Sequence, residues 1–223
     1  MNTNPQDGTS VKKYGLALHT ASRELGLAIS NFAGDSRCKT WNLDRDLATH
    51  LHQYLVEFIG PQTWADLAFI AVAKGPGGFT GTRMGMVTAR TLAQQLDIPV
   101  FAISTLAAVA WAAHPQPPQA SRGLLSIALQ MPAQRGQLFG AVYSVNKDSG
   151  LTELFPDTVM TAESWQEKLE SWKNSYQLIE VGSELGWSVS SVLELAYLEW
   201  KQGSRPDWSG ALPYYGQHPV KGH

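Results

Sequence analysis

The segment DLAFIAVAKG at residues 66–75 limits most strongly what this chain can fold into. A continuous run of small and β-branched apolar residues is typical of a strand that is buried on both faces. The glycine-rich stretch GPGGFTGTRMG at 75–85 follows at once, and a helical pattern then covers 82–96. A second strand at 98–104 and a second helix at 105–114 repeat the order. These crossover units predict an α/β fold with helices packed on a sheet.

Three further strand patterns precede this unit, at 14–20, 25–32 and 38–44. Short polar turns separate them, which predicts an antiparallel meander. Apolar residues then recur at helical spacing from Leu47 to Phe58, and Gly60-Pro61 ends the pattern. Asp44 or Asp46 is expected to cap this helix, because a carboxylate can accept hydrogen bonds from the first-turn N–H groups.

The chain is expected to form two lobes joined by a linker. Residues 114–123, HPQPPQASRG, contain three prolines and few apolar groups, as linkers do. We therefore expect a mobile tail at 1–12, a first lobe at 13–113 and a reduced second lobe at 124–223. The second lobe is expected to hold strands at 124–131, 136–145 and 176–181 and a helix opened by Thr161 as N-cap. Its late helix at 188–203 is a candidate to pack back on the first lobe.

Composition excludes several classes of function. The chain has 17 Lys plus Arg against 19 Asp plus Glu, so no basic surplus indicates a grip on nucleic acid. The single cysteine, Cys38, excludes an intramolecular disulfide or a cysteine metal cluster and fits a reducing compartment. No apolar run approaches the roughly 20 residues of a membrane helix, and the start lacks the apolar centre of a signal peptide. We expect a cytoplasmic protein that does not enter a membrane.

The glycine stretch satisfies neither of the common phosphate-binding motifs. A P-loop ends in Lys followed by Ser or Thr, where this chain has Thr82-Arg83, and Thr80 stands where a dinucleotide fingerprint needs its third glycine. Small residues also form a stripe on the following helix, and each glycine there costs about 1 kcal/mol relative to alanine. A packing reason is therefore expected, either within the chain or against another molecule. The stripe consists of Gly81, Gly85, Ala89 and Ala93.

The stretch KGPGGFTGTRMG resembles the signature GPGSFTGxRxG of the TsaB (YeaZ) family, a bacterial subunit of the machinery that adds a threonylcarbamoyl group to the adenosine beside the tRNA anticodon. The resemblance extends over LALHTAS near the start and, more loosely, over RGQLFGAVY, VGSELG and the terminal PYY. It implies the ASKHA fold (actin-like ATPase, ribonuclease H-like): two small α/β lobes with mixed β-sheets flanked by helices.

The resemblance also implies a scaffold without catalytic residues, cofactor or metal. Such a subunit binds TsaD, the related subunit that carries the metal and performs the transfer, while the ATPase TsaE joins the pair. It forms a homodimer when TsaD is absent, and it meets tRNA only indirectly. The helices that match 46–59 and 80–95 are implied to make the contact. The expected partner-binding residues are Leu51, Tyr54, Phe79, Thr80, Gly81, Arg83, Gly85 and Ala89.

Several positions depart from the pattern of active ASKHA enzymes. His19 stands where their first strand ends in aspartate, Pro132 and Gln137 replace two further carboxylates, and the arginine after the terminal tyrosines is missing. The resemblance thus implies a degenerate nucleotide site. The alternative function is an ATPase or small-molecule phosphotransferase that binds nucleotide between the lobes, which would need an acid at position 19. The degenerate site is expected at His19, Thr20, Gly75 and Gly182.

Overall fold

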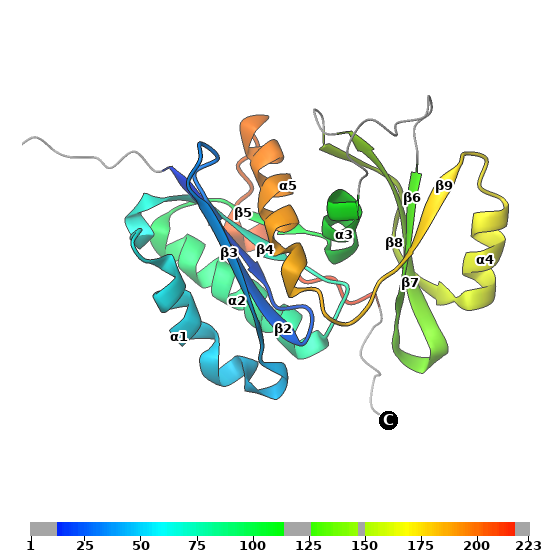
Figure 1. The fold of residues 1–223 in the computed structure, drawn as a ribbon, viewed down its shortest axis with the longest axis horizontal. Helices are drawn as coiled ribbons and strands as arrows, with labels where there is room; N and C mark the ends of the chain where they lie inside the picture. The colour runs from blue at the N-terminus through cyan, green and yellow to red at the C-terminus, as the bar shows by residue number, and fades with distance from the viewer. Residues whose placement is uncertain (1–12, 114–125, 147–149, 217–223) are drawn as a thin grey trace, which may run out of the picture.

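The computed structural model describes residues 13–113, 126–146 and 150–216, which form two lobes, each built on one β-sheet (Figure 1). The mobile tail expected at 1–12 and the linker expected at 114–123 lie outside the described residues. The predicted α/β chain of two small lobes, each with a mixed sheet flanked by helices, is confirmed. None of the helices within these ranges is long and apolar enough to cross a membrane.

The first lobe contains a five-stranded sheet in the order β3-β2-β1-β4-β5. The predicted meander is present, because β2 pairs antiparallel with both β1 and β3. The two predicted crossover strands extend the sheet in parallel, β4 beside β1 and β5 beside β4. The bounds are β1 Tyr14–His19, β2 Glu24–Ser30, β3 Ser36–Asn42, β4 Leu67–Ala73 and β5 Val100–Ile103.

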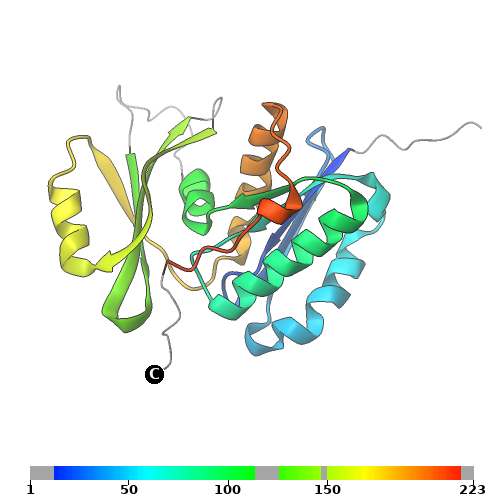
Figure 2. The ribbon, with the colours of Figure 1, turned by 180° about the vertical axis from the view of Figure 1, so that it is seen from behind.

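Helices cover both faces of this sheet. Helices α1 (Leu47–Ile59) and α2 (Phe79–Leu96) lie side by side on one face, and α3 (Thr105–Ala113) and α5 (Val189–Lys201) cover the other (Figures 1 and 2). Successive strand residues point to opposite faces. Leu16 and Leu18 of β1 accordingly belong to the core under α1 and α2, whereas Ala17 belongs to the core that includes α3 and α5.

The expected carboxylate cap of α1 is wrong. Asp46 occupies the N-cap position, but its side chain accepts no capping hydrogen bond. Gly60 ends the helix, as the sequence predicts. The helix is instead held by apolar contacts, because its residues Leu51, Leu55 and Phe58 lie buried at helical spacing in the core of the first lobe.

The second lobe contains a four-stranded sheet in the order β8-β7-β6-β9. Thr161 caps the predicted helix α4 (Ala162–Glu170), since its side chain accepts a hydrogen bond from Ser164 N at 3.2 Å. Trp165 and Leu169 of α4 pack on the sheet. The long strand β8 was not predicted. The bounds are β6 Ser126–Pro132, β7 Gln137–Asn146, β8 Gly150–Thr161 and β9 Tyr176–Glu180.

One cluster of buried residues connects the lobes. It joins Ala17 and Phe69 of the first sheet to Leu129 and Tyr143 of the second, with α3 and α5 between them. Helix α5 follows the second sheet in the chain but lies against β1, with Val192 and Ala196 fully buried. The mutual position of the lobes is therefore set by a continuous apolar core.

Candidate functional site

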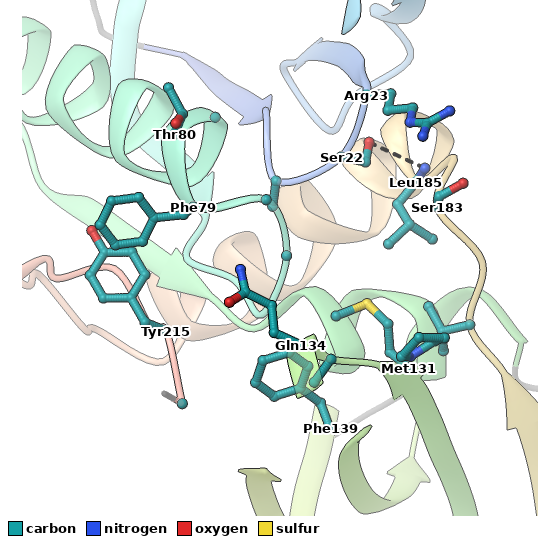
Figure 3. Close-up of a pocket in the computed structure, with 18 of the residues that line it drawn as sticks. Ser22, Arg23, Phe79, Thr80, Met131, Gln134, Phe139, Ser183, Leu185 and Tyr215 are labelled. Carbon is teal, nitrogen blue, oxygen red and sulfur yellow. Dashed lines mark hydrogen bonds between the residues drawn. The ribbon is translucent and has the colours of Figure 1, made fainter. Parts of the chain in front are cut away.

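A cleft of about 1390 Å³ opens between the two lobes (Figure 3). The first lobe supplies the turn after β1, the start of α1 and the glycine segment with the first turn of α2, while the second supplies the β6–β7 turn and residues 181–183 and 185. Phe139, Val159, Tyr215 and Gly216 complete the lining. Figure 3 shows Phe79 and Tyr215 side by side on one wall, with Arg23, Ser22 and Leu185 together on the other. The Ser22 hydroxyl accepts a hydrogen bond from Leu185 N at 3.3 Å.

The glycine segment serves a close contact between α2 and the turn after β1. Thr20 Oγ1 donates to Gly81 O at 2.8 Å, and Gly78 N donates to Ala21 O at 2.7 Å. A Cβ atom on Gly81 would overlap Thr20 O, and one on Gly85 would overlap Thr20 Oγ1. The stripe of small residues therefore has its packing reason inside the chain, which is one of the two alternatives that the sequence leaves open.

This packing corrects part of the expected partner-binding set. Leu51 and Ala89 are fully buried and Gly85 is buried, so these three residues belong to the first lobe's own interior. Gly81 is half-buried, packs against Thr20 and lines the cleft. The interpretation of the small-residue stripe as a face for a partner is wrong. The other four lie at or near the surface: Phe79 is 43% exposed, Thr80 and Arg83 are exposed, and Tyr54 is half-buried.

The outward faces of α1 and α2 carry an apolar signal that the sequence reasoning missed. Val56 of α1 is 62% exposed and Val87 of α2 is 60% exposed. Both helices pack on the sheet by their other faces, so these valines do not contribute to the core. Exposed apolar side chains mark a contact surface where they gather into one patch, whereas single ones are common on any surface. Helical spacing predicts their outward direction, because each lies off the buried stripe of its helix.

His19, the expected departure at the end of β1, lies in the interior. Its side chain has 0% exposure, and neither ring nitrogen has a hydrogen-bond partner within the described residues. Burial lowers the pKa of this imidazole to about 4, so it is neutral at pH 7. His19 is also absent from the lining of the cleft.

The other residues of the expected degenerate nucleotide site do not meet in the cleft either. Thr20 is fully buried and bonded to Gly81. Gly75 has a φ of 98° and packs so closely on Tyr214 O that a Cβ atom would overlap it. Gly182 is the one member of the predicted set that lines the cleft. The cleft therefore does not bring these four residues together.

The residues present do not fit a metal-assisted nucleotide site of the kind the fold family implies. A neutral, enclosed imidazole cannot supply the anionic oxygen that such a site needs at the end of β1. Pro132 and Gln137 do line the cleft, but neither carries a charge. Within the described ranges, no three His, Cys, Asp or Glu side chains are grouped so that they could hold a metal ion.

A polar cluster that the sequence did not reveal ties the lobes together. Asp157 of β8 accepts hydrogen bonds from Tyr143 Oη at 2.7 Å and from Ser104 Oγ at 2.6 Å. The Tyr214 hydroxyl donates to the backbone carbonyl of Asp157, and Tyr214 N donates to Lys74 O at 2.7 Å. Ser104 follows β5 in the first lobe, so the cluster links both sheets and the terminal segment.

Burial and hydrogen bonding have opposite effects on the pKa of Asp157 in this cluster. Burial raises the pKa of the Asp157 carboxyl, while the bonds from Ser104 and Tyr143 and the nearby Lys74 ammonium act in the opposite direction. Burial also raises the pKa of the Tyr143 phenol, which stays protonated and continues to donate. The cluster is a structural tie rather than an open catalytic site.

Comparison with known proteins shows which family the chain belongs to. Residues 59–177 match the model of the family described as TsaD: tRNA N6-adenosine threonylcarbamoyltransferase. The chain is 38% identical over 105 residues to the tRNA threonylcarbamoyladenosine biosynthesis protein TsaB of Bacillus subtilis, which covers 47% of this chain and 42% of that protein. It is 27% identical over 139 residues to the TsaB protein of Buchnera aphidicola from Acyrthosiphon pisum, which covers 61% of each. The chain thus matches about half the length of these curated relatives.

Solved structures agree with the fold. A Pseudomonas aeruginosa protein described as similar to peptidase YEAZ superposes with a TM-score of 0.73 at 20% identity, over 92% of this chain and 99% of that one. YeaZ from the same organism gives a TM-score of 0.71 at 20% identity, over 91% and 99%. Both lobes therefore have the arrangement seen in these structures.

Proposed function

Because the chain belongs to the TsaD family, described as tRNA N6-adenosine threonylcarbamoyltransferase, we propose that it takes part in making threonylcarbamoyladenosine in tRNA. The two TsaB relatives carry this biosynthetic role in their names. Because the proposed substrate is tRNA, we place the protein in the cytoplasm. The role that fits the geometry is that of a supporting subunit, and the observation that carries this choice is the state of His19.

A catalytic role would need a charged group at the end of β1 and access to the cleft. His19 has neither, because its side chain is fully buried and its imidazole is neutral at pH 7. The competing function of an ATPase or phosphotransferase is therefore disfavoured, because it would need an acidic residue at position 19. The chain acts by what it binds, and the transfer belongs to a partner.

The partner in this proposal is TsaD, which docks on the outward faces of α1 and α2. Val56 and Val87 supply the apolar centre of this surface, and Thr80, Arg83 and Phe79 lie at the start of α2. Burying a valine that is now mostly exposed contributes about 1 to 2 kcal/mol to association. TsaE joins through the pair, and the same surface forms a homodimer when TsaD is absent.

Size-exclusion chromatography with light scattering tests the docking surface. The chain mixed with TsaD of the same organism is expected to elute as a one-to-one complex. Val87→Asp should abolish the complex, because a carboxylate would be desolvated at the centre of the contact. Leu154→Asp is the matched control, since Leu154 is 40% exposed on β8 of the second lobe. Equal binding of TsaD by both variants would refute the assignment of the surface.

A further inference from the structure

Three arginine side chains line the cleft without a partner. Arg23 follows β1, Arg45 precedes α1, and Arg135 lies in the turn between β6 and β7. Across the described part of the chain, their guanidinium groups have no hydrogen bond, ion pair or aromatic ring. Every other arginine there has carbonyl oxygens or an aromatic ring as a partner. These partnered residues are Arg37, Arg83, Arg90 and Arg205.

The positive charge of the cleft is local rather than general. The whole chain has a formal net charge of -2, yet the described lining of the cleft holds three arginines against one carboxylate, Asp44. The N-cap of α2 is Gly78, which has no side chain to satisfy the first-turn N–H groups that border the cleft. The positive end of the helix macrodipole adds to the same potential. The cleft therefore attracts anions.

Aromatic rings line the same cleft as these cations. Phe79 and Tyr215 lie on the cleft wall with ring centroids 4.6 Å apart, and Phe139 lines the floor (Figure 3). Phe79 is 43% exposed although its ring is large and apolar. Exposed rings in a positively charged groove are the features on which single-stranded nucleic acid stacks its bases.

The size and layout of the cleft select among anionic ligands. Its volume of about 1390 Å³ exceeds the roughly 300–1,000 Å³ of small-molecule pockets. The arginines come from three separate segments of both lobes, so a ligand with charges spread along its length matches them better than one phosphate group. We propose that the cleft binds a single-stranded segment of RNA, with phosphates on Arg23, Arg45 and Arg135 and a base on Tyr215. This inference rests on the proposed function and changes one expectation, since the chain would then contact tRNA directly.

Fluorescence anisotropy with the full chain and a labelled single-stranded RNA of roughly 12 nucleotides tests the site. The triple variant R23Q/R45Q/R135Q is expected to weaken binding at least tenfold. Because each single-strand phosphate contact contributes about 0.7 to the salt slope, the slope of log K against log salt should fall by about 2. Tyr215→Leu should weaken binding without changing that slope, since stacking releases no counterions.

The control is the charge-matched variant K39Q/K173Q/K201Q, whose lysines do not line the cleft. Unchanged RNA affinity in this control supports the site. Equal losses in both triple variants, or no binding by the unaltered chain at low salt, would overturn it. Displacement of the RNA by polyglutamate as readily as by unlabelled RNA would overturn it in favour of an acidic protein segment. TsaD binding by the arginine variant is measured in parallel, so that failure of the RNA site and failure of the proposed function are told apart.

Discussion

His19 and Asp157 are both ionisable side chains, but the protein surrounds them in opposite ways. The His19 imidazole at the end of β1 is fully buried, has no hydrogen-bond partner among the residues that the structure describes, and its pKa falls to about 4. The Asp157 carboxylate at the lobe junction is partly buried and accepts bonds from Tyr143 and Ser104, while burial raises its pKa. The surroundings of His19 disfavour its charged form, whereas the surroundings of Asp157 offer hydrogen bonds to its carboxylate.

The difference shows that the polar contacts of these ionisable groups lie at the junction of the lobes and not at the end of β1. At the end of β1 the surroundings are packed and dry, so the position serves the interior of the first lobe. At the junction, hydroxyl groups from both lobes converge on one carboxylate. Asp157 and its partners therefore support the relative position of the lobes.

A substitution in the packing beside His19 should cause the largest loss of stability. Gly85→Leu would drive a side chain into Thr20, which is itself fully buried. We expect a loss of more than about 4 kcal/mol in the free energy of unfolding, or failure to fold, because neither backbone can move away. Urea denaturation followed by circular dichroism measures this loss. A nearly unchanged midpoint would show that α2 does not pack on the turn as described.

The Asp157 cluster should give the next largest effect. Asp157→Ala removes the acceptor of Tyr143 and Ser104, and each bond to a charged group is worth about 1.5–3 kcal/mol. We expect a loss of about 3 kcal/mol in the free energy of unfolding, and a smaller loss for Asp157→Asn, which keeps one acceptor oxygen. Denaturation of both variants at pH 7 measures this. Losses below about 0.5 kcal/mol in both would mean that the cluster does not tie the lobes.

The pH dependence of stability separates the two groups. The His19 pKa is lower in the folded chain than its ordinary 6.5, so its contribution is present above pH 6.5 and is lost as the pH falls toward 4. Between pH 7 and 5 the loss should be about 2 kcal/mol relative to His19→Asn, which cannot titrate. Asp157 has the opposite sign, because its raised pKa favours the folded chain as the pH falls. The difference between wild type and His19→Asn in urea denaturation is the quantity to follow, and a pH-independent difference would contradict the burial of a neutral imidazole.

Thr20→Val probes the smallest contribution. The substitution keeps the shape of the side chain but removes the bond from Thr20 Oγ1 to Gly81 O. We expect a cost of about 1 kcal/mol, typical of one neutral hydrogen bond, without a change in its pH dependence. Thermal unfolding monitored by circular dichroism is sensitive enough to detect it. A stabilising effect would indicate that the packing needs no polar contact at this turn.

Local sequence patterns predicted much of the first lobe, but not which residue its glycines contact. The apolar run at 66–75 and the helical pattern after it correctly gave β4 and α2, because periodicity depends on neighbours in sequence. The spacing of Gly81 and Gly85 indicated close contact as well. What they contact, Thr20, is distant in the sequence, and nothing in the local pattern distinguishes it from a second molecule.

The lobe junction could not be predicted, because Asp157 lies on a strand that lacks the usual pattern. Strand β8 has mostly exposed or half-buried residues, so its apolar positions do not alternate clearly. Pro156 stands within it, and proline in a strand is tolerated at a sheet edge, which is where β8 lies. Tyr143 lies on the neighbouring strand β7, but Ser104 follows β5 of the first lobe and is 53 residues from Asp157 in the sequence, so only the folded structure brings the cluster together.

Threonylcarbamoyl transfer to tRNA in a purified mixture tests the central claim most directly. The chain alone is expected to give no transfer, whereas TsaD with TsaE should transfer the group only when the chain is added. Val87→Asp should reduce transfer in proportion to its loss of TsaD binding, and Leu154→Asp should not. Transfer by the chain without TsaD, or full transfer by TsaD and TsaE without the chain, would contradict a supporting, non-catalytic role.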